Sequence, residues 1–386
     1  MDNWIEYSLG HLLSYEQPTA YIVESTNYDD KYKTPVLTAG KTFILGYTNE
    51  EQGIYDALPV IIFDDFTTAS QYVNFKFKVK SSAMKILTAN TDLVLPKFIF
   101  YRMQIIKFDA STHKRYWIQH YSKIKVKIPS LAIQERIVSH IEELFSQLDA
   151  SVNELKTAKE RLKVYRQAVL KDAFDSALQD NPPMMPIEEL LTTERKGIST
   201  GPFGTMIKKH EHQTTGIPML GIENIGAGKF IDGNKIFVTL EKAKELKSFV
   251  LLSGDIIISR SGTVGELCAV PKRMEGALLS TNLMRVSLNS DIIHSDYFIY
   301  LFQSKGVVLD QVKELCKGST RTFLNQTILK QIMFPIPDIS KQKEIIETIE
   351  LRMSVCDSIE RTLDIALQQA QVLRQSILKK EFEIQS

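Results

Sequence analysis

Ile-Pro-Ser-Leu-Ala-Ile-Gln-Glu-Arg-Ile-Val at residues 128–138 returns later in the chain as Ile-Pro-Asp-Ile-Ser-Lys-Gln-Lys-Glu-Ile-Ile at 336–346. The likeness continues without a gap as far as Phe174 and Phe382, so the whole stretch recurs at a constant shift of 208 residues. Solenoid repeats have much shorter periods of about 20–50 residues. The sequence therefore predicts two half-proteins, each made of a globular segment followed by a long helix.

Both copies of the repeat place apolar residues at the alternating four- and three-residue steps of a coiled-coil seam. Neither copy contains proline or glycine after its opening Ile-Pro, so nothing interrupts a helix of roughly 65–70 Å. We predict one antiparallel coiled coil between the copies; the alternative is that each helix packs on its own domain. The main predicted seam residues are Ile137, Ile141, Leu148, Leu155, Leu162, Ile345, Ile349, Leu363, Leu373 and Ile377.

Composition sets outer limits on the class of protein. A chain of 386 residues with 44% hydrophobic and 24% charged residues is expected to be an ordinary soluble protein of two or more domains. It has no apolar run of about 18 residues, and its N-terminus is acidic, which argues against a membrane helix or signal peptide. Three scattered cysteines, Cys268, Cys316 and Cys356, fit a reducing cytoplasm and indicate neither a disulfide framework nor a zinc site.

The net charge of +1 conceals a strong local asymmetry. Residues 1–65 carry 3 basic and 11 acidic side chains, whereas residues 66–127 carry 12 basic and 2 acidic ones. Lys76, Lys78 and Lys80 alternate, as do Lys123, Lys125 and Lys127, so each set would share one face of a strand. We expect a basic wall interleaved with aromatic residues and suited to a polyanion; the alternative is a solvated strand face. The aromatic residues are Tyr72, Tyr101, Tyr116, Trp117 and Tyr121.

The globular segments have the pattern of an α+β fold, with mixed α/β domains at 1–127 and 181–335 and long helices at 128–180 and 336–386. Residues 60–63 and 255–259 are apolar runs bounded by turn residues, and they predict one buried strand in each domain. Residues 98–101 and 298–300 predict a shared short helix. The pseudo-twofold repeat therefore extends to the domains.

Several apparent enzyme motifs in the second domain are incomplete. Asn-Pro-Pro-Met at 181–184 has methionine where an adenine methyltransferase needs an aromatic residue to stack the base. The glycine-rich stretch 221–229 has Glu223 at the first glycine of a phosphate loop and Phe230 where serine or threonine is required. His-Glu-His at 210–212 has no further ligands spaced to complete a metal site. We therefore expect neither catalysis, nor a metal, nor a cofactor in this chain.

The repeated Ile-Pro…Gln motif resembles the start of each conserved helix in specificity subunits of type I restriction-modification systems. Residues 252–265 and 317–325 resemble that family's recurrent stretches in and after a target recognition domain. The resemblance covers nearly the whole chain in the order domain, helix, domain, helix. The first domain departs from it, because Ile-Phe-Asp-Asp-Phe at 62–66 stands where the second domain has Ser-Arg-Ser-Gly.

The resemblance implies a non-catalytic reader of double-stranded DNA. Each target recognition domain would read one half of a bipartite site, and the helices would set the spacing and dock two modification (methyltransferase) subunits that use S-adenosylmethionine. Restriction (motor-nuclease) subunits that use ATP and magnesium would join for cleavage, and no membrane is involved. Dissimilar domains predict an asymmetric target. The alternatives are a coiled-coil scaffold that binds only proteins, or an enzyme whose activity needs no partner.

Candidate DNA contacts follow from chemistry and position. Arg260 follows a buried strand, where a guanidinium could meet guanine O6 and N7, and Asn224 or Asn282 could address adenine. For each candidate the alternative is a surface or structural polar group. The other candidates in the second domain are Ser261, Thr320, Arg321, Lys208, Lys209 and His210. Those in the first domain are Thr67, Thr68, Ser70, Gln71, Lys76, Lys114, Arg115 and Tyr116.

Overall fold

The computed structural model describes residues 4–38, 42–108, 115–203, 206–226, 228–260, 265–304, 306–315 and 324–383, apart from the side chains of residues 177, 178 and 313. The chain divides into two compact units, Met1–Lys156 with Asp364–Ser386, and Thr157–Leu363. Each unit contains one globular part and a piece of both long helices. We call the globular parts the first domain (residues 4–130) and the second domain (residues 179–338).

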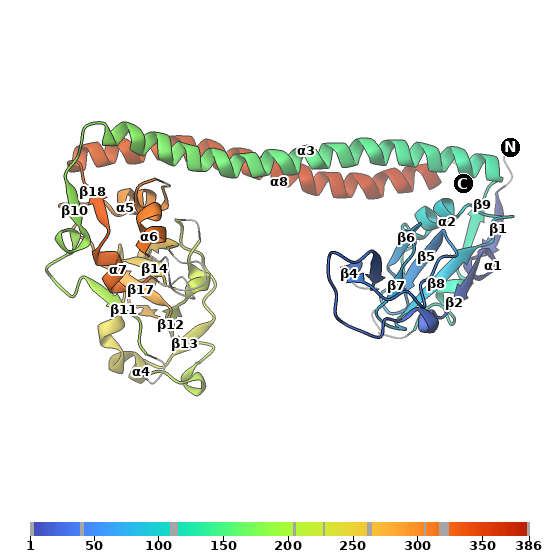
Figure 1. Cartoon of the computed structure of the whole chain (residues 1–386), viewed down its shortest axis with the longest axis horizontal. Helices are drawn as coiled ribbons and strands as arrows, with labels where there is room; N and C mark the ends of the chain where they lie inside the picture. Colours follow the sequence, from blue (N-terminus) through green and yellow to red (C-terminus); the bar gives the residue numbers. More distant parts are fainter. Residues whose placement is uncertain are drawn as a thin grey trace. The chain divides into compact units, whose positions relative to one another are not determined.

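The first domain is built on an antiparallel sheet in the order β2-β8-β5-β6 (Figure 1). All five residues of β5 (Val60–Asp64) are buried, and alternate side chains enter two different cores. Ile61 and Phe63 share a core with Phe98 and Ile99 of α2 (Pro96–Met103), whereas Val60 and Ile62 face a second, smaller core. The sheet is therefore covered on both faces. Its other strands are β2 (Leu13–Glu16), β6 (Ser70–Val73) and β8 (Met84–Ala89).

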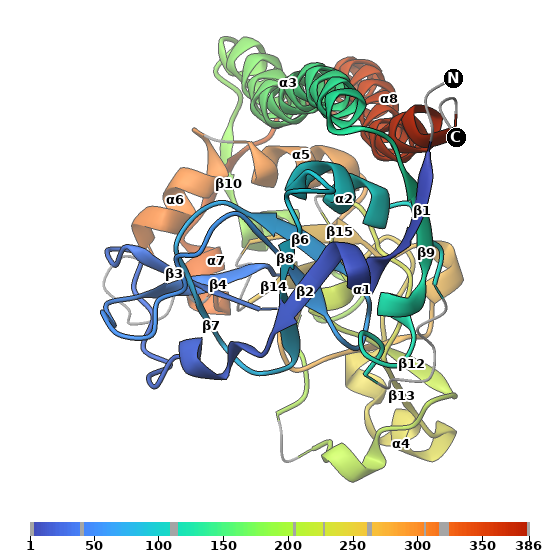
Figure 2. The same cartoon turned by 90° about the vertical axis from the view of Figure 1, so that its right-hand side faces the viewer.

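A second, three-stranded sheet in the order β4-β3-β7 packs on the smaller core. β3 pairs antiparallel with β4 and parallel with β7. A separate two-stranded ribbon joins β1 to β9, the strand that leads into the first long helix (Figure 2). The remaining elements are β1 (Ile5–Ser8), α1 (Leu9–Leu12), β3 (Thr34–Leu37), β4 (Ile44–Thr48), β7 (Lys78–Val79) and β9 (Lys125–Ile128).

The second domain repeats this topology strand for strand. Its sheets have the orders β11-β17-β14-β15 and β13-β12-β16, and the ribbon is β10-β18. In β14 (Ile256–Ser259), Ile256 and Ile258 face one core while Ile257 faces another, as in β5. The predicted pair of buried strands and the predicted pair of short helices are both confirmed. The other strands are β10 (Met184–Pro186), β11 (Ile198–Thr200), β12 (Ile217–Leu220), β13 (Ile236–Val238), β15 (Leu267–Ala269), β16 (Leu278–Leu279), β17 (Leu283–Val286) and β18 (Met333–Pro335).

The helices of the second domain are short, and the two long helices follow the repeated motif. α3 (Leu131–Leu178) has 48 residues and α8 (Ile339–Glu383) has 45, so each would be about 70 Å long. No described helix is long and apolar enough to cross a membrane. The short helices are α4 (Leu240–Glu245), α5 (Ser295–Gln303), α6 (Val308–Leu315) and α7 (Gln326–Lys330).

Ion pairs show that α3 and α8 are antiparallel in each unit. In the first unit, His140 contacts Glu381 at 3.1 Å and Asp149 accepts from Arg374 at 2.6 Å. In the second unit, Arg166 donates to Asp357 at 2.7 Å and Arg352 donates to Asp172 at 2.5 Å. Arg374 is the repeat of Arg166, and Asp357 is the repeat of Asp149, so the same pair is made in both units. The predicted antiparallel coiled coil is confirmed.

A buried glutamine joins each domain to the start of the long helix that follows it. Gln134 Nε2 donates to the carbonyls of Leu93 (3.0 Å) and Pro129 (2.9 Å), while its Oε1 accepts from the amide of Leu95 (2.8 Å). Since Leu95 directly precedes α2, this side chain fixes the covering helix to the long helix.

Gln342 makes the equivalent three bonds in the second unit. Its Nε2 donates to the carbonyls of Ile292 and Pro337, both at 2.9 Å, and its Oε1 accepts from the amide of His294 at 2.8 Å. Both glutamines are completely buried. The repeated glutamine of the sequence is therefore a structural clamp.

The far end of the other long helix also packs on each domain. Phe382 of α8 lies against Phe98 of the first domain, with ring centroids 5.3 Å apart. Phe174 of α3 lies against Tyr297 of the second domain at 5.6 Å. Each domain is therefore held by the start of one long helix and the end of the other.

The predicted seam is buried most fully where the helices also meet a domain. Ile137 and Ile141 join the core of the first domain, and Ile345 and Ile349 join that of the second, so both predicted packing modes occur together. Leu162 is buried as well. The remaining predicted seam residues are half-buried (Leu148, Leu155, Leu363 and Ile377) or, for Leu373, 50% exposed.

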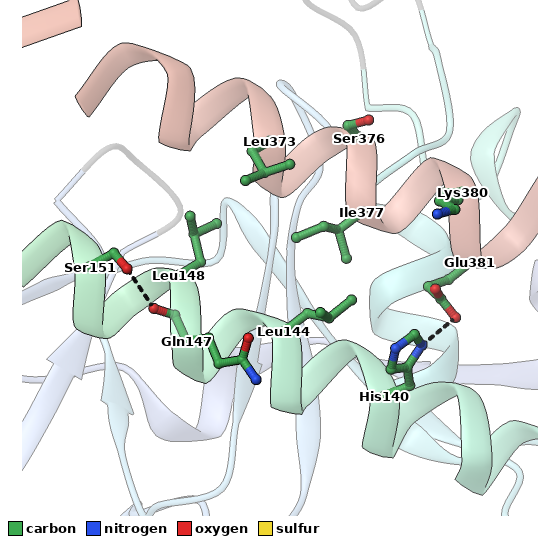
Figure 3. Close-up of a pocket in the computed structure, with 10 residues that line it drawn as sticks. All are labelled: His140, Leu144, Gln147, Leu148, Ser151, Leu373, Ser376, Ile377, Lys380 and Glu381. Carbon is green, nitrogen blue, oxygen red and sulfur yellow. Dashed lines mark hydrogen bonds and ion pairs between the residues drawn. The ribbon is translucent and has the colours of Figure 1, made fainter. Parts of the chain in front are cut away.

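The exposure of Leu373 arises from an open groove of about 620 Å³ between the helices in the first unit. Figure 3 shows Leu373 and Ile377 of α8 facing Leu144 and Leu148 of α3 across it. The contact of His140 Nδ1 with Glu381, at 3.1 Å, closes one end. The apolar side chains of α3 and α8 are therefore not fully packed against each other in this part of the first unit.

Candidate nucleic-acid interface

Arg260 lies directly after the buried strand β14, as the sequence predicts. Its backbone amide donates to the carbonyl of Asn282 at 3.0 Å, and its Nη1 donates to the carbonyl of Thr281 at 3.3 Å. Partial burial lowers the pKa of Arg260. These bonds hold the guanidinium at the edge of the sheet, beside the loop that precedes β17.

The same loop lines a pocket of about 290 Å³ together with Lys209 and His212. Thr281 and Asn282 are both exposed there, and Glu223 is its acidic member. The structure thus brings three sequence candidates, Arg260, Lys209 and Asn282, to one place. We call this pocket, with Arg260 at its rim, the reader pocket.

Lys208, Lys209 and His210 are all exposed on a short turn next to the reader pocket. The neighbouring Glu211 accepts from the backbone amide of Lys208 at 2.6 Å and pairs with Lys242 at 2.8 Å. These contacts lower the pKa of Glu211, the bond from Lys242 being the largest cause. The acidic residue of the turn is therefore neutralised, which leaves two lysines and a histidine facing solvent.

Asn224 is a structural residue, so its proposed contact with adenine was wrong. Its side chain is completely buried. Oδ1 accepts from the amide of Gly221 at 2.9 Å, and Nδ2 donates to the carbonyl of Ile231 at 3.0 Å. Because a buried amide is held by such bonds, this side chain cannot turn to a base.

The polar loop of the first domain is the turn between β5 and β6. Thr67 and Gln71 are exposed and Thr68 is half-buried with φ of 61°, whereas Ser70 is almost wholly buried. Ser70 Oγ accepts from Gln104 Nε2 at 2.8 Å, so it fixes the turn from behind and cannot contact DNA directly. Three of the four predicted loop residues remain accessible.

The predicted basic wall of the first domain is only partly present. Lys78 is buried and pairs with Glu50 at 2.8 Å, because the short strand β7 turns it inward. Lys76 is exposed but pairs with Asp56 at 3.4 Å. By contrast, all three lysines of the set Lys123, Lys125 and Lys127 are exposed on or just before β9, and Lys125 pairs with Glu6 at 3.0 Å.

The aromatic residues expected on this wall belong mainly to the core. Tyr116, Trp117 and Tyr121 are buried, and burial raises the pKa of Tyr121 to about 12. Tyr116 packs edge-on against Phe108 at 5.1 Å, so it was wrong as a DNA contact. Arg115 is exposed. Ser261, Thr320, Arg321 and Lys114 lie outside the residues that the structure describes.

A second pocket of the second domain, of about 580 Å³, holds a cluster of cations that the sequence did not suggest. Its charged lining residues, within the part of the chain that the structure describes, are Arg195, Lys196, Lys247 and Arg285. We call it the basic pocket. A lone arginine within the apolar strand Leu-Met-Arg-Val at 283–286 was the available sequence signal.

Arg285 forms the floor of the basic pocket and is 3% exposed. Its Nη1 donates to the carbonyl of Val250 at 3.0 Å and its Nη2 to that of Lys196 at 2.9 Å. Burial, followed by the nearby charge of Arg195, lowers the pKa of Arg285. Arg195 itself is paired with the buried carboxylate of Asp255. The carboxylate of Asp255 thus pairs directly with Arg195, whereas the guanidinium of Arg285 is held by two backbone carbonyls.

Comparison with known proteins identifies the family. The chain is 32% identical over 385 residues to the EcoR124I/EcoR124II type I restriction enzyme specificity subunit of Escherichia coli, which covers 95% of this chain and 92% of that protein. The chain belongs to the type I restriction enzyme specificity subunits. The StySPI specificity subunit of Salmonella potsdam is 24% identical over 307 residues, or 77% of this chain and 65% of that protein.

One solved structure supports the fold of this specificity subunit. A chain from a structure of complex assembly and conformational transition of the type I R-M system matches with a TM-score of 0.66. The match covers 98% of this chain and 97% of the other, at 15% identity. A family model described as type I restriction modification DNA specificity domain matches residues 202–369, which include most of the second domain and the larger part of α8.

The strand register shows how the two domains of the specificity subunit differ at the candidate reader. Ile61 pairs with Leu87, and Ile256 pairs with Val286, so these two positions are equivalent. Four residues later the first domain has Asp65 where the second has Arg260.

Asp65 is turned into the first domain rather than toward solvent. It accepts from the backbone amide of Trp117 at 2.8 Å and lies 3.5 Å from the buried Lys85. The arginine of one domain therefore has an internal carboxylate as its counterpart in the other.

Proposed function

We propose that this protein is the non-catalytic DNA-reading subunit of a type I restriction-modification complex. Each domain reads one half of an asymmetric bipartite site, and α3 and α8 together set the spacing between the two readings. The observation that carries this proposal is that the two domains share one topology but differ at the candidate reader. Where the second domain has Arg260, the first has the inward-facing Asp65. Two domains with the same topology but different residues at the candidate reader suit two different half-sites.

The reader pocket is the proposed centre of recognition in the second domain. Arg260 can present its guanidinium to guanine O6 and N7, and the amide of Asn282 matches adenine N6 and N7. Lys208, Lys209 and His210 are placed beside it as phosphate contacts, which supply affinity without sequence information.

In the first domain the proposed contacts are the exposed members of the β5–β6 turn together with Lys76 and Arg115. Thr67, Thr68 and Gln71 offer hydroxyl and amide groups that can bond to base edges. The exposed lysine face beside β9 adds positive charge to the same domain. Recognition here would rest on hydrogen bonds from neutral side chains more than on an arginine.

The proposed partners follow from the family. Two modification subunits that bind S-adenosylmethionine would dock on the helices and methylate adenine, and restriction subunits that use ATP and magnesium would add cleavage. The two copies of the helix pair offer equivalent surfaces, which fits two modification subunits per chain. An alternative is a system in which methylase and nuclease are one polypeptide.

A coiled-coil scaffold without DNA recognition is the rival function, and the salt dependence of DNA binding separates the two. A reader that contacts several phosphates must lose affinity steeply as salt rises, because each neutralised phosphate releases counterions. Weak binding with a flat salt dependence would favour the scaffold.

The direct test is co-expression of the full chain with the modification subunit encoded beside it, followed by sequencing of methylated adenines. A bipartite motif with two different halves is expected. Arg260→Ala should then relax or abolish one half of the motif while the other half and the assembly with the modification subunit persist. Arg273→Ala is the matched control, since Arg273 is exposed on the same domain but pairs with Asp232 away from both pockets. An unchanged motif in Arg260→Ala would refute the assigned role.

A further inference from the structure

The basic pocket is separate from the proposed base-reading residues, and its chemistry is that of an anion site. Lys196 and Lys247 are exposed at its mouth, and Arg285 lies at its floor. Ser199, Thr200 and Ser248 add small polar groups to the lining. The buried carboxylate of Asp255 lies next to this pocket. It already pairs with Arg195 and accepts hydrogen bonds from Ser287 Oγ (2.7 Å) and the amide of Leu252 (2.7 Å). The pocket therefore carries excess positive charge.

The buried guanidinium of Arg285 strengthens this argument. Its Nη1 and Nη2 are used by two carbonyls, but its Nε is buried without a hydrogen-bond partner among the described residues. An unpaired buried donor carries a free-energy penalty, and a charged one carries a larger penalty. An anion seated in the pocket would compensate the charge that the protein leaves unbalanced.

The basic pocket adjoins the reader pocket through a single segment of chain. Thr200 is the last residue of the edge strand β11, and the described residues Thr200, Gly201, Phe203 and Met206 line the basic pocket. Gly201 approaches the loop before β17 so closely that a Cβ there would lie 1.8 Å from the carbonyl oxygen of Ser280. Ser280 belongs to the reader pocket. A strand of DNA that meets the reader pocket would therefore reach the basic pocket within a short distance.

Phe203 stands on this connecting segment with 71% of its surface exposed, beside the 39% exposed Met206. An aromatic ring next to a cluster of cations is the combination with which proteins hold a nucleotide, the ring against the base or sugar and the cations on the phosphate.

We propose that the basic pocket seats one backbone phosphate of the bound DNA and that Phe203 packs against the adjoining nucleotide. This proposal rests on the proposed function as a DNA reader. It adds an anchoring site to the second domain, with Lys196 and Lys247 as the residues that meet the phosphate and Arg285 as the fixed charge behind them.

The test uses the full chain in complex with its modification subunit, and duplex DNA carrying the motif that the wild-type complex methylates. Lys196→Gln/Lys247→Gln is compared with Lys235→Gln/Lys272→Gln, a control pair of exposed lysines on the same domain outside both pockets. Binding is measured across a salt series. The pocket variant should lower the slope of log affinity against log salt by about one, the contribution of one neutralised phosphate, without changing the methylated motif. The control pair should keep the wild-type slope.

A second arm identifies the phosphate. Single neutral methylphosphonate linkages are placed at each position of the half-site read by the second domain. One position should weaken wild-type binding but have no effect on the pocket variant. Phe203→Ala should weaken binding with an unchanged salt slope, since it removes apolar packing against a nucleotide rather than charge.

The outcomes separate the two proposals. If the wild-type complex binds and methylates DNA but the pocket variant keeps the wild-type slope and methylphosphonate profile, the phosphate site is wrong and the reader function stands. A pocket variant that instead loses its modification subunit would assign the pocket to protein assembly and also overturn the proposal. If the wild-type complex neither binds nor methylates DNA, the reader function itself fails.

Discussion

Gln134 and Gln342 are the residues on which the attachment of each domain most directly depends. Each is completely buried and makes three hydrogen bonds to backbone groups on both sides of the junction. Gln134→Leu or Gln342→Leu should lower the free energy of unfolding of the affected unit by about 3 kcal/mol, because buried backbone groups lose their partners. Denaturant unfolding of the full chain measures this effect.

The control for both substitutions is Gln371→Leu, at an exposed position of α8. It should change the free energy of unfolding by no more than about 0.5 kcal/mol. Equal effects at all three positions would show that the hydrogen bonds of the two buried glutamines contribute nothing special.

At the same scale, the structure brings together three residues chosen from the sequence, Arg260, Lys209 and Asn282, and their contact with DNA stays a prediction. It failed at Asn224 and Ser70, because a polar side chain that satisfies the backbone of its own turn has the same residue type as one that faces a ligand. Arg285 was missed because a single arginine in an apolar strand gives no sign in the sequence that it contributes to a site. Only the register of β17 shows that this arginine lies at the floor of a pocket.

At the scale of the secondary-structure elements, the pair α3 and α8 contains an ionic cluster around Asp357, whose carboxylate becomes protonated at low pH. Asp357 accepts from Lys229 at 2.8 Å and from Arg166 at 2.7 Å, and these bonds, that from Lys229 first, hold its pKa below the ordinary value of 3.8. A lowered pKa means that the stabilisation is complete above pH 3.8 and is lost as the pH falls through the folded-state pKa.

Asp357→Asn should therefore destabilise the second unit at neutral pH, and the difference from wild type should shrink below about pH 4. Denaturant unfolding at a series of pH values from 7 to 2.5 measures this. Glu347→Gln, an exposed carboxylate of the same helix, serves as the control and should show little difference throughout. A difference for Asp357→Asn that stays constant with pH would show that the carboxylate charge is not responsible.

Long elements were the most predictable part of the fold. The extent of α3 and α8 followed from the absence of proline and glycine, and β5 and β14 followed from their apolar runs. Short strands such as β7 (two residues) have too few side chains to show a period, so the sequence could not reveal that Lys78 points inward. The predicted basic wall was incomplete for this reason.

For the whole molecule, the continuity of α3 and α8 between the two units gives a prediction about spacing. Inserting four residues after Lys156 in α3 and four after Ala366 in α8, positions that the antiparallel register puts level, should lengthen each helix by about 6 Å. That is near two base-pair steps of about 3.4 Å. We expect the methylated motif to keep both halves and gain about two base pairs between them.

Sequencing of methylated adenines in cells that express the lengthened chain with its modification subunit provides the measurement. Substituting four residues at the same positions without changing the length is the control, and it should leave the motif as it was. Altered half-sites around an unchanged gap would count against the spacing role of the helices.

Each domain packs on the start of one long helix and on the end of the other, and this arrangement has an evolutionary consequence. Consider a half-length polypeptide of one domain and one long helix. The phenylalanine at the end of its helix would have no domain to pack on, and its domain would lack the phenylalanine of the other helix. Two such copies would complete each other as a symmetric homodimer and would read a palindrome. Gene duplication and fusion of that ancestor would keep Phe174 and Phe382 in their exchanged places, while freeing each domain to diverge toward its own target.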